Sequence, residues 1–67
     1  MKDFAVYEHI DGLCHYLDTI NEEVTECVTE NCRTAMEVEE YVENINKMQS
    51  TDKYGRKRYL YVHWFTD

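Results

Sequence analysis

The chain has 67 residues, of which 14 are acidic and 7 are basic, so its formal net charge is −7. A chain this short is expected to form a single small domain over residues 1–67, and it buries only about 60% of the surface that its unfolded form exposes. No catalytic motif, phosphate-binding loop or repeated cysteine pair occurs in it, which argues against an enzyme and against a bound cofactor or metal.

Charge is distributed unevenly along the chain. Residues 1–46 carry 12 acids and two cations, a net of −10, whereas residues 47–67 carry five cations and two acids, a net of +3. A dominant negative field repels nucleic acid and anionic membranes and attracts basic proteins. We therefore expect a basic protein partner, no direct binding of nucleic acid and no membrane association.

The expected compartment is the cytoplasm. The chain has no signal-peptide pattern and no apolar run that approaches the roughly 18 residues of a membrane span. Its odd number of cysteines argues against a closed disulfide framework and fits reduced thiols.

The N-terminal part of the chain allows two interpretations. Phe4–Tyr7 is wholly apolar, which suits either a buried strand or the start of a helix. Asp11-Gly12 is typical of a hairpin turn and would pair Phe4–Ile10 with Leu13–Ile20.

Helical spacing favours a helix after this turn. Apolar residues recur at intervals of three and four, as on one face of a helix. They are Val6, Ile10, Leu13, Leu17, Ile20, Val24 and Cys27. We therefore predict a first helix from about Gly12 to Asn31, with Asp11 as its N-cap. Asp3–His9 is predicted as a strand, because the C-terminal strand needs a partner for its backbone.

Thr34 and Glu37 have the spacing of a capping box, which predicts a second helix from Ala35 to about Met48. Its predicted apolar face consists of Ala35, Val38, Val42, Ile45 and Met48. The short link between the two helices predicts an antiparallel helical hairpin, and one long bent helix is the alternative.

The C-terminal part is predicted to be a loop followed by a strand. Gln49–Gly55 is polar and rich in turn formers, and Tyr59–Phe65 is aromatic and β-branched. Leu60, Val62 and Trp64 should point to one face of this strand, and Tyr59, Tyr61, His63 and Phe65 to the other. The helices can cover one face of a two-stranded sheet. We therefore expect an α+β domain with the order β-α-α-β, whose aromatic face is completed by a homodimer.

The predicted helices carry the candidate partner-binding residues. Glu22, Glu26 and Glu30 are four residues apart and form a like-charged row, which costs a few tenths of a kcal/mol per pair. Such a row imitates the phosphates of nucleic acid and can occupy the basic groove of a nucleic-acid-binding protein; an ordinary solvated face is the alternative. The residues predicted to contact the partner are Glu22, Glu23, Glu26, Glu30, Glu37, Glu40 and Glu43.

A second hypothesis places the working surface on the C-terminal strand, as in a homodimeric adaptor or antitoxin-like module. Its contacts would be made by Tyr59, Tyr61, His63 and Phe65. The cations from Lys53 to Arg58 precede these aromatics, as in single-stranded nucleic-acid binders, or else Arg56 and Arg58 pair with helix carboxylates. Cys14 and Cys27 are expected to be buried as small hydrophobic residues rather than to bind zinc.

In size and acidity the chain resembles the small phage-encoded proteins that disable host defences, such as anti-CRISPR and anti-restriction proteins. The resemblance rests on no motif. It implies a stoichiometric inhibitor that acts as a DNA mimic on a basic, nucleic-acid-binding host factor.

Overall fold

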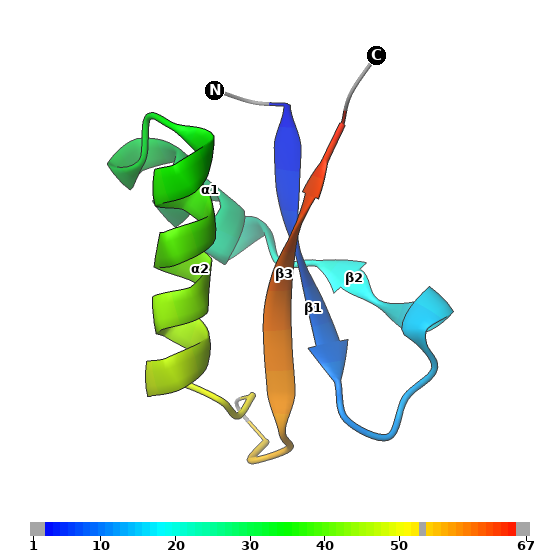
Figure 1. Cartoon of the computed structure of the whole chain (residues 1–67). Helices are drawn as coiled ribbons and strands as arrows, with labels where there is room; N and C mark the ends of the chain where they lie inside the picture. The colour runs from blue at the N-terminus through cyan, green and yellow to red at the C-terminus, as the bar shows by residue number, and fades with distance from the viewer. Residues whose placement is uncertain (1–2, 53, 66–67) are drawn as a thin grey trace.

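The computed structural model describes residues 3–52 and 54–65, with the exception of the His15 side chain. The elements are, in chain order, β1 (Phe4–Ile10), the 3-10 helix η1 (His15–Leu17), β2 (Thr19–Ile20), α1 (Glu22–Asn31), α2 (Ala35–Met48) and β3 (Arg58–Trp64). The strands form an antiparallel sheet in the order β2-β1-β3, and both helices lie on one side of it (Figure 1). The predicted α+β domain with the order β-α-α-β is confirmed, with the short β2 as an addition.

β1 and β3 pair along their whole length, from Phe4 opposite Trp64 to Ile10 opposite Arg58. Aromatic and β-branched residues dominate both strands, which suits an extended, partly buried backbone. The predicted alternation along β3 is confirmed, because alternate side chains reach the core and the opposite face of the sheet. The core lies between the sheet and the helices and consists of Phe4, Val6, Val28, Cys32, Val38, Val42 and Leu60.

The predicted first helix over Gly12–Asn31 is wrong in its first half. The chain turns at Asp11-Gly12, where Gly12 has a φ of 91° that favours glycine. The Leu13 N–H closes this turn by donating to the Ile10 carbonyl oxygen at 3.1 Å. After η1 the chain returns beside β1 as β2, so the hairpin alternative describes this part better.

Asn21 is the N-cap of α1, in place of the predicted Asp11. Its side-chain Oδ1 accepts the backbone N–H three residues later at 3.0 Å. The apolar residues whose spacing indicated a longer helix are not buried, since Leu13, Leu17 and Ile20 are each about half exposed. Periodicity alone therefore placed the start of the helix too early.

α2 begins and ends as predicted. The Thr34 Oγ1 accepts the Glu37 N–H at 3.2 Å, and a Glu37 carboxylate oxygen accepts the Thr34 N–H at 3.1 Å, which completes the capping box. The expected break between the helices is present, and α1 passes behind α2 in Figure 1. Of the predicted apolar face, Val38 and Val42 in the middle of the helix are buried, whereas its two end residues are exposed.

Two helix side chains complete the backbone hydrogen bonding of the two long strands. Thr25 of α1 accepts the Val6 N–H at 3.0 Å. Asn46 of α2 accepts the Leu60 N–H at 2.7 Å through Oδ1 and donates to the Leu60 carbonyl oxygen at 2.8 Å through Nδ2. Asn46 therefore takes the place of a neighbouring strand beside β3 and fixes α2 to the sheet.

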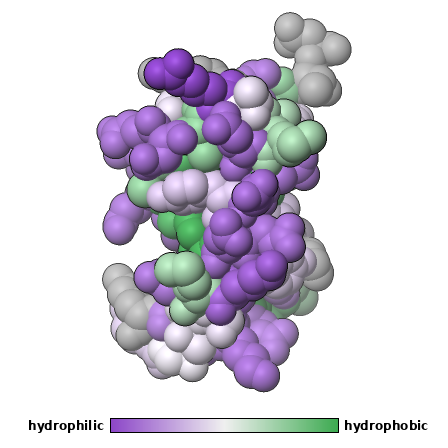
Figure 2. All heavy atoms as spheres, turned by 60° about the vertical axis from the view of Figure 1, so that its left-hand side comes forward, coloured by the Kyte–Doolittle hydropathy of each residue, from purple (hydrophilic) through white to green (hydrophobic). Residues whose placement is uncertain are grey.

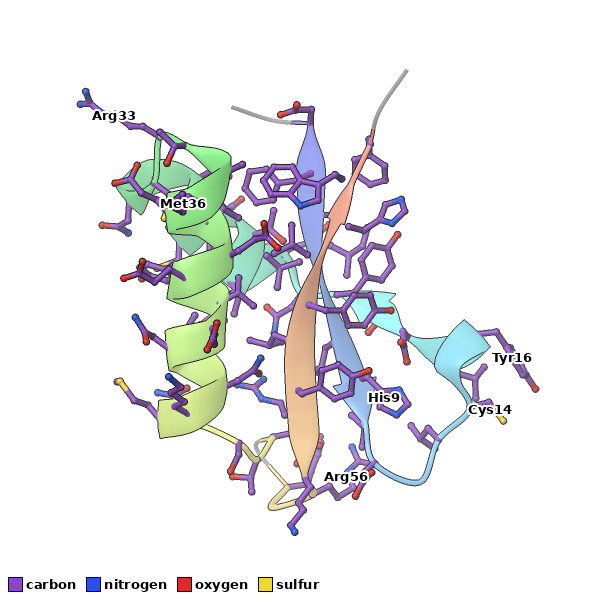
Figure 3. All side chains as sticks on the ribbon, viewed as in Figure 1. His9, Cys14, Tyr16, Arg33, Met36 and Arg56 are labelled. Carbon is purple, nitrogen blue, oxygen red and sulfur yellow. The ribbon has the colours of Figure 1, made fainter. Side chains whose placement is uncertain are left out.

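The predicted burial of Cys14 and Cys27 is wrong, because both are exposed and Cys32 is the buried cysteine. Cys14 points away from the body of the molecule in Figure 3. The Cys27 Sγ lies 3.1 Å from the Tyr41 hydroxyl, so this thiol joins α1 to α2. Burial raises the pKa of the Cys32 thiol, and the nearby Glu37 carboxylate adds to the effect.

Candidate protein-binding surfaces

The predicted partner-binding carboxylates are all exposed on the two helices. They are Glu22, Glu23, Glu26 and Glu30 of α1 and Glu37, Glu40 and Glu43 of α2, here termed the acidic helical surface. The side of the molecule that carries the helices is mostly hydrophilic, and hydrophobic side chains show in a hollow near its middle (Figure 2). The sequence therefore placed these acids correctly at the surface.

The arginines of the basic C-terminal segment do not neutralise this surface. A guanidinium nitrogen of Arg58 lies 2.6 Å from the Glu8 carboxylate, and one of Arg56 lies 2.9 Å from the Asp52 carboxylate. The interpretation that Arg56 and Arg58 pair with helix carboxylates is thus wrong, because their partners are in a strand and a loop. Lys53 of the same segment lies outside the described residues.

Two members of the acidic helical surface have partners within the chain. Glu43 forms an exposed ion pair with Lys47 at 3.6 Å, worth about 0.5 kcal/mol or less. Glu37 accepts the N–H groups of Arg33 and Thr34, both at 3.1 Å, and these hydrogen bonds lower the pKa of Glu37. The members that form no ion pair with any described residue are Glu22, Glu23, Glu26, Glu30, Glu37 and Glu40.

Asp52 organises the loop between α2 and β3. Its Oδ1 accepts the backbone N–H groups of Tyr54 at 3.0 Å and Arg56 at 2.8 Å, and its Oδ2 accepts the Arg56 Nε at 2.9 Å. Burial by itself would raise the pKa of Asp52, but these hydrogen bonds and the positive charge of Arg56 outweigh it, so the pKa is lowered. The loop is therefore held by its own hydrogen bonds.

Aromatic rings line the sheet face opposite the helices. The Tyr7 and Tyr61 rings stack across the two long strands with centroids 5.7 Å apart, and the His9 and Tyr59 centroids are 5.3 Å apart. All four predicted second-interface residues lie here, and the aromatic face, as termed here, consists of Tyr7, His9, Tyr59, Tyr61, His63 and Phe65. Tyr59 is 44% exposed.

Asp18 joins the loop after β1 to this aromatic face. Its Oδ1 lies 2.7 Å from the His9 Nδ1, and its Oδ2 accepts the Tyr61 hydroxyl at 2.6 Å. The hydrogen bond to Asp18, together with burial, raises the pKa of Tyr61 to about 12. No local sequence pattern indicates this contact, because Asp18 is 9 residues from His9 and 43 from Tyr61.

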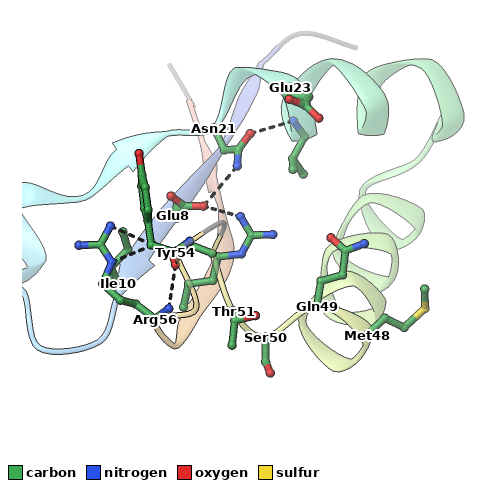
Figure 4. Close-up of a pocket in the computed structure, with 13 residues that line it drawn as sticks. Glu8, Ile10, Asn21, Glu23, Met48, Gln49, Ser50, Thr51, Tyr54 and Arg56 are labelled. Carbon is green, nitrogen blue, oxygen red and sulfur yellow. Dashed lines mark hydrogen bonds and ion pairs between the residues drawn. The ribbon is translucent and has the colours of Figure 1, made fainter.

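A groove opens on the helix side of the molecule and has two parts. The larger part, of about 780 Å³, lies between the start of α1, the end of α2 and the loop that follows α2. The smaller part, of about 330 Å³, lies between the two helices. Glu23, Val24, Met48 and Gln49 line both parts, and Figure 4 shows Met48 and Gln49 across the opening from Glu23. Sequence reasoning missed this groove.

The ion pair between Glu8 and Arg58 forms part of the wall of the larger part. Their side chains are only 18% and 13% exposed, and Asn21 donates to the same Glu8 oxygen at 3.4 Å. The Arg58 Nε is buried and has no acceptor among the described residues. Breaking such a pair is costly, because the charge left behind is poorly solvated.

Within residues 3–52 and 54–65, no three side chains of the metal-binding types come together, and no helix is long and apolar enough to cross a membrane. Comparisons with protein families, with curated proteins and with solved structures give no match for this chain. Function is therefore inferred from the chemistry of the acidic helical surface, the aromatic face and the groove.

Proposed function

We propose that this protein is a non-enzymatic inhibitor whose acidic helical surface binds a basic surface of a protein partner that otherwise binds nucleic acid. The observation that carries the proposal is the distribution of ion pairs. Arg56 and Arg58 form ion pairs with Asp52 and Glu8, and of the helix acids only Glu43 forms an ion pair with a described residue. The negative charge of the helices is thus available to another molecule.

The repulsion along the glutamate row of α1 and the charge in its last turn oppose the stability of the helix, although Glu22 and Glu23 in the first turn suit the positive end of the helix dipole. Glu22, Glu26 and Glu30 repel one another at intervals of four residues, and the last turn of α1 contains no basic residue to balance the negative end of the helix dipole. If these acids serve binding, replacing them raises the stability of the protein and weakens its binding to the partner.

A surface of this kind acts by electrostatic attraction. Its field speeds the encounter with a basic partner and disfavours acidic proteins, and salt weakens the attraction because the charges are exposed. Because a nucleic-acid-binding groove is basic, an acidic protein seated in it excludes nucleic acid from the same site. No bond is formed or broken, so inhibition requires one copy of this protein for each site.

The test is capture of partners from a host lysate by the immobilised protein, at low and at high salt, followed by a binding assay with the purified partner. We expect the double variant Glu26→Gln/Glu30→Gln to bind the partner at least about tenfold more weakly. The matched control is Asp3→Asn/Asp11→Asn, which removes the same charge from exposed positions outside the helices. Equal effects of the two variants, or binding that salt does not weaken, would contradict the proposal.

The aromatic face supports a second candidate, a homodimer in which two copies pack these faces together. Tyr59 and Phe65 are 44% and 48% exposed on this face, and exposed apolar side chains that gather on one face mark interaction sites. The face lies opposite the helices, so this packing would keep the two acidic helical surfaces far apart and would avoid their repulsion.

Sedimentation velocity tests the dimer directly. If the candidate is correct, the wild type sediments as a dimer, and the double variant Tyr59→Ser/Phe65→Ser sediments as a folded monomer. Tyr61→Ala is a less specific probe, because the Tyr61 hydroxyl also holds Asp18. A monomeric wild type over the whole accessible concentration range would exclude the dimer.

A further inference from the structure

The groove joins an apolar recess to a charged channel. The recess between the helices has Val24, Ile45 and Met48 among its lining residues. Met48 is 79% exposed at the end of α2 although methionine is apolar, and its flexible thioether can adapt to a ligand. The volume of the recess, about 330 Å³, is at the lower end of the range for ligand pockets, roughly 300–1,000 Å³.

The acidic residues that line the groove differ in whether they already form an ion pair within the chain. Glu8 and Asp52 are neutralised by Arg58 and Arg56. Glu23 forms no ion pair with any described residue, and it lines both the recess and the channel. A ligand therefore meets an available carboxylate at the junction, directly beside an apolar recess.

This combination selects the chemistry of the ligand. An apolar side chain in the recess would remove its own surface and that of Met48 from water. A lysine or arginine nearby in the same ligand would pair with the exposed Glu23 carboxylate, and the apolar side chain seated beside it would exclude water and strengthen the pair. An acidic ligand would be repelled by Glu23, and a purely polar cation would leave the recess unfilled.

We infer that the groove binds an extended segment of the basic partner, in which an aliphatic side chain enters the recess and a neighbouring lysine or arginine pairs with Glu23. The inference rests on the proposed function and assigns its most specific contact to Glu23 and Met48. The acidic helical surface then provides general attraction, whereas the groove selects one segment of the partner.

Short synthetic peptides test this inference even before the partner is identified. The first is a capped peptide that contains lysine and leucine, the second replaces its leucines with serine, and the third replaces its lysines with glutamate. Each is titrated into isotopically labelled protein, and amide chemical shifts are recorded by NMR. We expect the lysine–leucine peptide to shift the resonances of Val24, Ile45 and Gln49, and to bind at least about tenfold more tightly than the lysine–serine peptide.

The chain offers two matched pairs of variants. Met48 and Met36 are both 79% exposed, but only Met48 lines the groove; Met36 lies near the start of α2 (Figure 3). Glu23 and Asp3 are both exposed acids, but only Glu23 lines the groove, and Asp3 lies outside the acidic helical surface. We expect Met48→Ser and Glu23→Gln each to weaken binding of the lysine–leucine peptide about tenfold, and Met36→Ser and Asp3→Asn to change its affinity less than about twofold.

The outcomes separate the two proposals. If the serine peptide binds as tightly as the leucine peptide, or if both members of a variant pair have the same effect, the groove does not select and the inference is overturned. Salt-sensitive partner capture would still support the acidic helical surface in that case. If the lysine–leucine peptide selects the groove but Glu26→Gln/Glu30→Gln leaves partner binding unchanged, the inferred groove specificity stands and the proposed function fails.

Discussion

Replacing Glu30 with lysine should stabilise this protein. Glu30 is exposed in the last turn of α1, four residues after Glu26, and that turn contains no basic residue. The substitution removes a like-charge repulsion, creates a favourable pair with Glu26 and places a positive charge at the negative end of the helix dipole. Loss of the repulsion and gain of the ion pair are each worth about 0.2–0.5 kcal/mol, and the interaction of the lysine with the helix dipole is worth about 0.3–1 kcal/mol.

The expected gain in the free energy of unfolding is therefore about 1 kcal/mol, or roughly 4–8 °C in Tm for a domain of this size. Urea and thermal unfolding followed by circular dichroism measure it. Glu30→Gln removes the repulsion without adding the pair or the positive charge, so it should give about half the gain. High salt should reduce the difference between each variant and the wild type, because the charges are exposed.

The reasoning would be refuted if Glu30→Lys lowered the stability or left it unchanged at low salt. Such a result would mean that Glu30 already has a favourable electrostatic environment in the folded chain. If stability rises while binding of the basic partner falls, the acid is retained at a thermodynamic cost for binding, as the proposed function requires.

Three further outcomes follow from particular side chains. Asn46→Ala should lower the free energy of unfolding by about 1–2 kcal/mol, because two hydrogen bonds to β3 are lost, and it should speed hydrogen exchange of the Leu60 amide. The control Asn44→Ala should be near neutral in the same unfolding assay. The lowered pKa of Glu37 contributes stability that is present above the ordinary carboxyl pKa of about 4.5 and is lost as the pH falls through the pKa of the folded state. The free energy of unfolding of Glu37→Gln should therefore fall less steeply with decreasing pH than that of the wild type. The raised pKa of Tyr61 contributes stability that is fully present below about pH 10 and is lost as the pH rises from 10 to about 12. In an ultraviolet titration, the wild type should therefore show one tyrosine that ionises near pH 12, and Tyr61→Phe should lack it.

The elements with local sequence signals were predicted well. The capping box predicted the start of α2 correctly, because its hydrogen bonds involve only the side chains and backbone N–H groups of Thr34 and Glu37. The alternation of β3 predicted which side chains reach the core, because opposite faces of a strand follow from geometry alone. The predicted start of α1 was wrong, because Leu13, Leu17 and Ile20 have the spacing of a helix face. In the structure, Leu13 closes the turn at Asp11-Gly12, Leu17 belongs to η1 and Ile20 to β2.

The features of the candidate sites that depend on distant contacts could not be read from the sequence. Exposure of the acidic helical surface was predictable, because charged residues on one helix face remain solvated. The pairing of Arg58 with Glu8, which leaves the helix acids uncompensated, joins residues 50 positions apart. The groove likewise depends on how the end of α2 lies relative to the start of α1, and no local pattern specifies that arrangement.

The central claim is that the acidic helical surface occupies a nucleic-acid-binding site of a basic partner. The most direct measurement is a competition assay with the captured and purified partner, in which labelled nucleic acid is displaced by this protein. We predict competitive displacement, with an apparent affinity that falls as salt rises and that Glu26→Gln/Glu30→Gln reduces at least about tenfold. A ternary complex of partner, nucleic acid and this protein, with no loss of nucleic-acid affinity, would contradict the claim.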